Sequence, residues 1–121
     1  MVTKKGKEIT GKKYVKQRKK RKYEIAGQKR AVKLGEDARK NKKTRGGNKK
    51  VFLIKSKLVN VKSGNKILKT IIRKVIETPS NKFLARQNII TKGTILDTEL
   101  GKVRVTNRPS QEGMINGILF E

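Results

Sequence analysis

The residues of this chain that could do chemistry are mostly cations, and they occur in dense groups. The densest run is Arg18-Lys19-Lys20-Arg21-Lys22-Tyr23, and a second group is Arg45-Gly46-Gly47-Asn48-Lys49-Lys50. Lys and Arg at this density bind phosphate, and paired glycines let backbone N–H groups approach a phosphate closely. Taken alone, the first run fits a solvated charge block or a nuclear-targeting segment about as well as it fits RNA binding. The basic character extends over residues 1–50, however, and this length favours nucleic-acid binding.

The second group and two tyrosines leave alternatives open. The Gly-Gly pair fits both a flexible hinge before the first strand and an RNA contact. Tyr14 and Tyr23 are equally suited to stacking on an exposed base and to a local packing contact. The RNA-binding residues predicted in this part of the chain are Lys12, Lys13, Tyr14, Arg18, Lys19, Lys20, Arg21, Lys22, Tyr23, Lys29, Arg30, Arg39, Arg45, Gly46, Gly47, Asn48, Lys49 and Lys50.

The positive charge is concentrated in the first part of the chain. The 121 residues carry 34 Lys and Arg against 9 Asp and Glu, a net charge of +25. Residues 1–50 hold 21 of these cations and 4 acids, but only 12 apolar residues. A segment this charged and this poor in apolar side chains cannot offset its chain entropy by burial. The sequence therefore predicts a basic RNA-binding extension over residues 1–50, disordered when alone, and a folded core over residues 51–121.

Several chemistries are disfavoured by what the chain lacks. It has no His and no Cys, so the usual zinc sites, disulfides and acid–base groups near neutral pH cannot be built. Asp97 and Glu99 lie two apart on a predicted strand, which fits a solvent-facing pair near Lys102 or Arg104 better than a metal site. The phosphate-loop signature ending in Gly-Lys-Ser or Gly-Lys-Thr does not occur. We expect a protein that is not an enzyme, with no catalytic residue, metal, cofactor or small-molecule substrate.

The sequence does not indicate a membrane protein either. A spanning helix needs roughly 20 apolar residues, and the longest apolar run is Val51 to Ile54. The N-terminus begins with charged residues and has no apolar segment of the kind that a secretory signal contains. We therefore expect no membrane partner.

Residues 51–121 have the texture of an all-β domain, rich in Val, Ile, Thr and Leu with short turn signals. Strands are predicted over 51–61, 67–77, 94–100, 102–107 and 114–120, with a short strand or an extended edge over 83–90. Apolar residues in 67–77 recur at helical spacing, but most are β-branched and follow a turn at 62–65, which favours a strand. Five or six short strands in about 70 residues fit a small β-barrel. Three cations, Lys92, Arg104 and Arg108, either extend the RNA-binding surface onto the barrel, which we favour, or are solvated surface, and Arg86 is also predicted to bind RNA.

One long stretch of this domain is similar to a known family. From Arg86 the chain reads Arg-Gln-Asn-Ile-Ile-Thr-Lys-Gly, followed by Glu-Leu-Gly-Lys at 99–102 and Val-Thr-Asn-Arg-Pro at 105–109. This pattern resembles the small-subunit ribosomal protein numbered eight of the eukaryotic and archaeal type. The basic run 18–24, Leu34-Gly35 and 45–48 resemble the family's tail and its junction with the core. The Trp and the Gly-Arg-Ser element that often open the family are absent, which weakens the transfer of RNA contacts to residues 1–17. The lack of a long insertion fits the compact archaeal form.

The resemblance implies a structural function, namely binding and stabilising small-subunit rRNA by neutralising phosphates with the tail and the barrel surface. Its implied partners are rRNA and neighbouring ribosomal proteins, and its implied location is the small subunit of cytoplasmic ribosomes. Composition by itself predicts only a polyanion-binding protein. A non-ribosomal nucleic-acid packaging protein or RNA chaperone is therefore the alternative, and an rRNA-processing enzyme is a weaker one. Deleting residues 1–44 is expected to leave the barrel folded but to weaken RNA binding.

Overall fold

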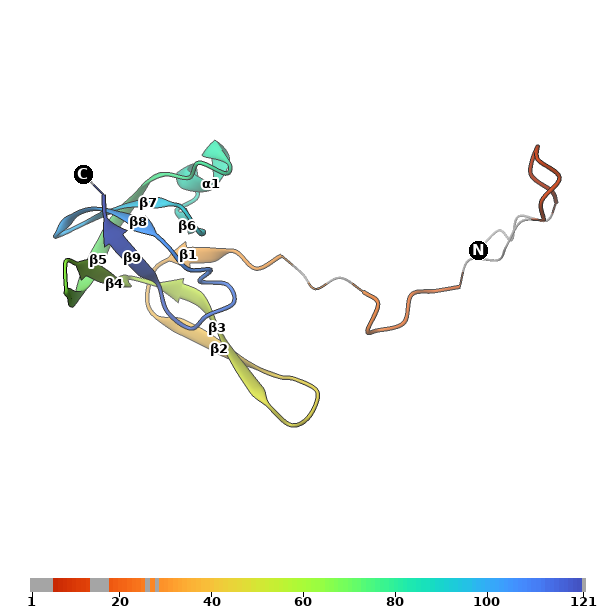
Figure 1. Cartoon of the computed structure of the whole chain (residues 1–121), viewed down its shortest axis with the longest axis horizontal. Coiled ribbons are helices and arrows are strands. Elements are labelled where there is room, and N and C mark those ends of the chain that lie inside the picture. The colour runs from red at the N-terminus through yellow and green to blue at the C-terminus, as the bar shows by residue number, and fades with distance from the viewer. Residues whose placement is uncertain (1–5, 14–17, 26, 28, 121) are drawn as a thin grey trace.

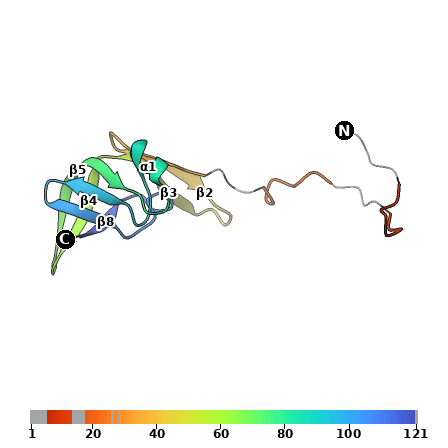
Figure 2. The same ribbon diagram turned by 90° about the horizontal axis from the view of Figure 1, so that it is seen from above.

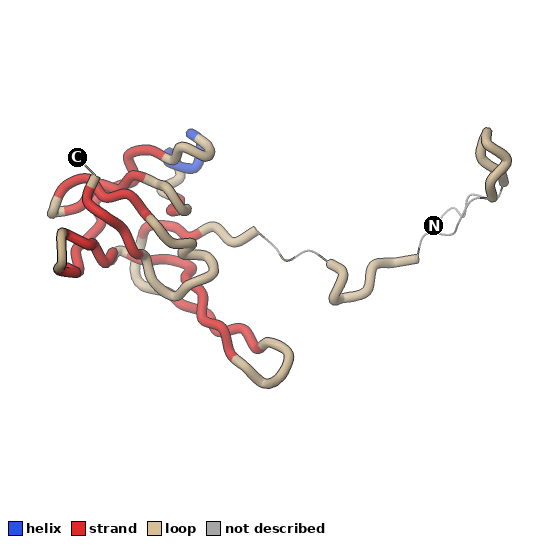
Figure 3. The backbone as a smooth tube through the Cα atoms, viewed as in Figure 1, coloured by secondary structure: helices blue, strands red, loops and turns tan. Residues whose placement is uncertain are grey.

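The structure is a computed structural model that describes residues 6–13, 18–25, 27 and 29–120. Regular structure within these ranges is almost entirely β-strand (Figure 3), as the sequence predicts. The elements are β1 (Val32–Leu34), β2 (Ala38–Lys43), β3 (Lys49–Ser56), β4 (Leu58–Ser63), β5 (Lys66–Glu77), α1 (Lys82–Arg86), β6 (Ile89–Ile90), β7 (Ile95–Thr98), β8 (Gly101–Val105) and β9 (Asn116–Leu119). Among the described residues no helix has the length and apolar character needed to cross a membrane.

Strands β4, β5, β7, β8 and β9 close into a barrel (Figure 1). Neighbouring strands pair antiparallel except β4 and β9, which run parallel with Asn60 opposite Asn116. The Asn60 side-chain amide donates a hydrogen bond to Oδ1 of Asn116 at 3.1 Å, and this bond joins the two strands where the barrel closes. The prediction of a small barrel of five to six strands is confirmed, and so are the strand over 67–77 and the β7–β8 hairpin.

A second sheet, with strands in the order β2-β3-β1-β6, shares one hydrophobic core with the barrel. Alternate residues along the strands point inward and supply this core. Its buried members are Val32, Leu53, Val59, Val61, Ile72, Val75, Ile90, Leu96, Val103, Val105 and Ile115. Sheet and barrel are therefore packed into one unit and cannot be separated without exposing core residues.

The structure differs from the expected disordered extension over residues 32–43, which form β1 and β2. The physical reason is long-range pairing, because β1 lies between β3 and β6 and Val32 is opposite Ile90. Val32 is only 1% exposed. The expected boundary at Lys50 falls inside β3, and the barrel begins at β4. A deletion of residues 1–44 would thus remove two strands and a core residue, so we no longer expect it to leave the fold intact.

Two predicted strands are wrong in detail. The stretch 51–61 is not one strand, because it turns a corner between β3 and β4 and so passes from the sheet into the barrel. At this corner the Ser56 hydroxyl accepts a hydrogen bond from the Leu58 N–H at 3.1 Å, a local bond that competes with strand pairing. The stretch 83–90 holds α1 and then the two-residue strand β6. Asn81 caps α1 by accepting a hydrogen bond from the Phe83 N–H at 2.9 Å.

Candidate nucleic-acid interface

The β2–β3 hairpin projects from the body of the molecule and concentrates positive charge (Figure 1). Its antiparallel register places Lys42 opposite Lys50 and Lys43 opposite Lys49. Like charges directly opposite each other destabilise a strand pair. Neither of the ion pairs recorded among the described residues involves these four lysines. A polyanion from outside the chain would relieve their repulsion.

The outer face of this hairpin carries functional candidates that sequence reasoning missed. Residues opposite each other in an antiparallel pair point to the same side, so Lys40 lies beside Phe52, on the face that also holds Lys42. Phe52 belongs to an unbroken apolar run, which indicated a core strand. In the structure Leu53 is buried while Phe52 is only half-buried. The sequence does not show the usual alternation of apolar and polar residues, because both faces of β3 carry apolar side chains here.

The Arg45-Gly46-Gly47-Asn48 segment forms the tip of the hairpin rather than a hinge before the first strand. The N–H and the hydroxyl of Thr44 both donate to the Asn48 carbonyl, at 2.7 and 3.0 Å. Gly46 and Gly47 have φ angles of 84° and 79°, a left-handed conformation that glycine adopts without steric cost. The glycines thus close the turn, and Arg45 is exposed at the tip.

We call residues 1–25 the arm, and Figure 2 shows its described parts, residues 6–13 and 18–25, lying outside the barrel. Arg18 is paired within the arm, with Nη1 donating to Glu24 Oε2 at 2.9 Å. The Arg21 N–H donates to the same oxygen at 3.0 Å. The pKa of Glu24 is held below its ordinary value mainly by the hydrogen bond from Arg18 and, to a smaller extent, by the one from the Arg21 N–H. The side chains of residues 19–22 are exposed around this turn.

The remaining predicted residues of the arm are also accessible where the structure describes them. Lys12 and Lys13 are exposed at a small turn in which the Glu8 N–H donates to the Lys12 carbonyl at 2.8 Å. Tyr23 is 61% exposed, and the Arg45 guanidinium lies 5.9 Å from its ring centroid. Tyr23 therefore both contacts the hairpin tip and keeps much of its ring accessible. Tyr14 lies outside the described residues.

The four predicted cations of the barrel part are exposed, and none of them belongs to β2 or β3. Arg86 ends α1, which lies on the opposite side of the body from the hairpin in Figure 1. Arg104 is on β8 opposite Ile95 and Ile118, while Lys92 and Arg108 lie in the loops before β7 and after β8. The structure thus brings Lys49 and Lys50 together with the missed lysines of β2, whereas these four cations lie on other elements. Arg108 directly precedes Pro109, whose carbonyl accepts a hydrogen bond from the Leu53 N–H of β3 at 3.4 Å.

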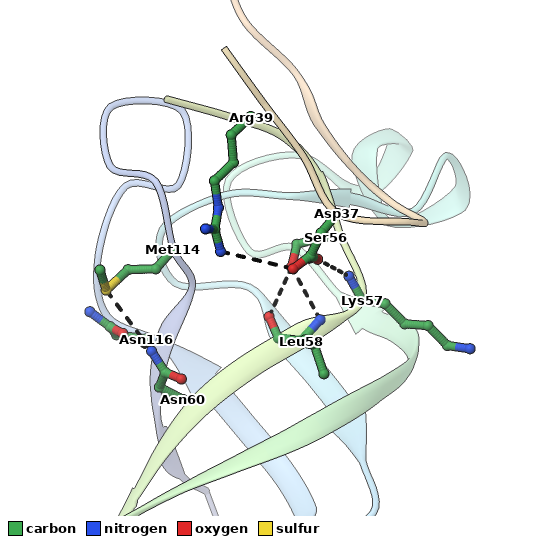
Figure 4. Close-up of polar contacts among 8 residues, drawn as sticks. All are labelled: Asp37, Arg39, Ser56, Lys57, Leu58, Asn60, Met114 and Asn116. Atoms are coloured by element: carbon green, nitrogen blue, oxygen red, sulfur yellow. Dashed lines mark hydrogen bonds and ion pairs between the residues drawn. The ribbon is translucent and has the colours of Figure 1, made fainter. Parts of the chain in front are cut away.

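Arg39 lies on the face of β2 opposite to Lys40 and Lys42, at the corner between sheet and barrel (Figure 4). Its guanidinium is 3.9 Å from the Asp37 carboxylate. Asp37 Oδ1 accepts hydrogen bonds from the Ser56 hydroxyl at 2.7 Å and from the Lys57 N–H at 3.2 Å. These contacts hold the corner at which β3 ends, and so they set the direction in which the hairpin projects.

Replacing Asp37 by Asn is expected to destabilise this corner in a pH-dependent way. The Ser56 hydrogen bond chiefly, with the Lys57 N–H, Arg39 and Lys69, holds the pKa of Asp37 below its ordinary value of 3.8, although desolvation opposes the shift. A lowered folded-state pKa contributes stability above the unfolded pKa and loses it as pH falls through the folded value. At neutral pH the variant should lose about 1 kcal/mol, because the side chain is about one-third exposed.

Urea unfolding at neutral pH and at about pH 3 measures this effect, and the advantage of the wild type should shrink at the lower pH. Glu36→Gln is the control, because it removes one negative charge from the exposed preceding residue. An equal stability difference at both pH values would show that the Asp37 carboxylate does not hold the corner.

Among the described residues, the acidic side chains do not form a second kind of site. Asp97 lies opposite Lys102, whereas Glu99 is in the turn after β7, so strand alternation does not place the two acids on one face. In the part of the chain that the structure describes, no three or more His, Cys, Asp or Glu side chains gather as a metal site would require.

The fold and the distribution of charge place the chain in the class of small basic β-barrel proteins. A model of the family described as Ribosomal protein S8e matches residues 2–120. The chain therefore belongs to the ribosomal protein S8e family, and the resemblance seen at Arg86 to Pro109 is confirmed.

Three archaeal relatives illustrate the similarity, and each is named small ribosomal subunit protein eS8. The protein of Staphylothermus marinus is 48% identical over 115 residues, which cover 93% of this chain and 90% of the relative. That of Nanoarchaeum equitans is 43% identical over 115 residues, covering 93% and 91%. That of Methanococcoides burtonii is 40% identical over 114 residues, also covering 93% and 91%. The similarity therefore extends over nearly the whole of each chain.

Proposed function

We propose that this protein is a structural constituent of the small ribosomal subunit that binds and stabilises small-subunit rRNA. The observation that carries the proposal is the β2–β3 hairpin, in which two pairs of lysines face each other on a projecting element. Their repulsion lowers the stability of the free protein, and an RNA backbone would neutralise it. The names of the archaeal relatives support the small subunit as the location.

The chemistry of this interface is phosphate neutralisation. Lysine ammonium groups and the exposed backbone of Gly46 and Gly47 suit phosphate oxygens, which carry no sequence information. With a net charge of +25, the chain can neutralise many phosphates and release their counterions. The protein would then recognise the shape of folded rRNA and hold RNA segments together where their phosphates repel.

The arm has a different part in this proposal from the hairpin. Its described residues contribute no member of the hydrophobic core. Ordering a residue costs about 1–2 kcal/mol for the backbone alone, and phosphate contacts can supply that energy. We infer that the described parts of the arm, residues 6–13 and 18–25, are disordered in the isolated protein and become ordered between RNA surfaces.

The proposal also defines the surroundings of the protein. Its partners are small-subunit rRNA and neighbouring ribosomal proteins, its location is the cytoplasmic ribosome, and no membrane or small-molecule substrate is involved. The role is structural rather than enzymatic.

Ribosome fractionation tests the location, and RNA binding tests the activity. The protein should sediment with the small subunit after a salt wash, and its absence from that fraction would contradict the proposal. Filter binding should show tighter association with small-subunit rRNA fragments than with duplex DNA of equal length. Equal affinity for both would favour the alternative, a general nucleic-acid packaging protein or RNA chaperone.

A further inference from the structure

We propose that the outer face of the β2–β3 hairpin contains a pocket for one unpaired RNA base, built on the stacked pair Arg30 and Phe52. This inference rests on the proposed function and deepens it, because it identifies one part of the RNA that is recognised. The pocket lies where the segment before β1 passes the sheet, and it is distinct from the dispersed phosphate contacts of the arm.

The cavity is large enough for a base. Its volume is about 500 Å³, within the roughly 300–1,000 Å³ range of small-molecule sites. The residues that line it are Gly27, Lys29, Arg30, Ala31, Lys40, Asn41, Lys42, Phe52, Leu53 and Ile54. Apolar side chains from β3 form one part of the lining, and cations from β2 and from the segment before β1 form another.

The Arg30 guanidinium lies 3.8 Å from the centroid of the Phe52 ring. At this separation the planar cation covers the ring face, and the contact holds the long arginine side chain in one place. Arg30 is exposed, so it remains accessible to a ligand. Unpaired bases stack on aromatic rings and on guanidinium planes. A base can therefore extend the existing stack from the Arg30 side.

The positive charges around the stack suit the phosphates on either side of a bound base. Lys29, Lys40 and Lys42 line the same cavity, and its described lining contains no carboxylate. Phosphates on either side of an inserted base would meet these ammonium groups. A fully paired helix keeps its bases stacked inside and offers only its backbone, so it cannot fill the pocket. The combination points to a bulged or looped nucleotide, with stacking rather than base-edge hydrogen bonds as the source of recognition.

The test compares two RNA probes with the full-length protein. One is a short RNA duplex with a single bulged 4-thiouridine, and the other is the same duplex with that nucleotide paired to adenosine. The wild type should prefer the bulged probe by about tenfold, which corresponds to about 1.4 kcal/mol. On irradiation, the bulged thiouridine should crosslink to a peptide that contains residues 29–31 or 51–54.

Two variants and two controls separate the pocket from general charge. Arg30→Lys keeps the charge but removes the planar group, so it should abolish the preference for the bulged probe and leave the salt dependence unchanged. Phe52→Leu should do the same if it folds normally. Arg73 and Phe83 lie outside the lining of this cavity, so Arg73→Lys and Phe83→Leu should leave the preference unchanged.

The outcomes distinguish failure of the pocket from failure of the proposed function. Tight binding of both probes with no preference, a preference that survives Arg30→Lys, or crosslinks confined to other peptides would overturn the pocket. Failure to bind either probe or small-subunit rRNA would instead overturn the proposed function.

Discussion

Removal of residues 1–25 is expected to weaken rRNA binding by at least about a hundredfold while leaving the folded core intact. The arm contains 11 Lys and Arg against 2 Glu. If about half of these cations contact phosphates, the negative slope of log affinity against log salt should become shallower by about 4. The core should persist because its described members begin at Val32. Filter binding across a salt series measures the slope, and thermal unfolding measures the fold.

The control for this truncation is a chain of natural length in which residues 1–25 are replaced by a Gly/Ser sequence. It should bind like the truncated protein, since the arm acts by charge. Restored affinity in that control would mean that chain length or backbone contacts matter more. An unchanged salt slope after truncation would assign the binding to the hairpin alone.

Gly117→Ala is expected to cause the largest loss of stability of the single substitutions considered for this chain. A Cβ atom at position 117 would lie 2.4 Å from Cγ1 of Val103 and 3.0 Å from the backbone oxygen of Arg104. Gly117 on β9 pairs with Val61 of β4 and with Val105 of β8, so it sits at the closure of the barrel. Because the buried Val103 side chain must shift within a packed core and the Arg104 backbone lies close behind it, we expect a loss of about 3 kcal/mol and a Tm lower by about 10–20 °C.

Gly27→Ala is the matched control, because a Cβ atom there would meet nothing within 4 Å. It should leave the thermal unfolding curve unchanged. Calorimetry or circular dichroism checks both variants, and a Gly117→Ala protein that melts like the wild type would contradict the close packing of β8 against β9. Gly117→Ala should also weaken RNA binding less than the arm truncation does at temperatures where the variant remains folded.

The first prediction depends on the charge of the arm, which the sequence shows directly. The second depends on a packing contact of Gly117, which the sequence does not show. The charge of the arm is visible in composition alone, and the strands over 67–77 and 95–105 follow from β-branched residues and turn signals. The need for glycine at position 117 is not visible, because it arises from Val103 and Arg104 on a neighbouring strand. Likewise Val32 looks like part of a polar extension until β3 and β6 are placed on either side of it.

In the candidate interface, too, some residues could be predicted from the sequence and others only from the structure. Sequence analysis selected Arg45 to Lys50 and the run Arg18 to Lys22 because their charge density is local. It missed Lys40, Lys42 and Phe52. Cross-strand register brings these residues to one face, and the Arg30 guanidinium lies over the Phe52 ring. It also grouped Arg39 with the other cations, although the structure places Arg39 beside Asp37 at the corner.

The sequence by itself determined that this is a basic all-β chain of the ribosomal protein S8e family with a cation-rich arm, because composition, local pattern and motif order are properties of neighbouring residues. Tertiary structure alone decided that the folded core begins at Val32, that Ser56 turns the chain from sheet to barrel, and that lysines and an arginine–phenylalanine stack line one cavity. These features depend on contacts between residues distant in sequence. Such contacts form only when the free energy gained by burying the core offsets the entropy lost in closing the intervening loops.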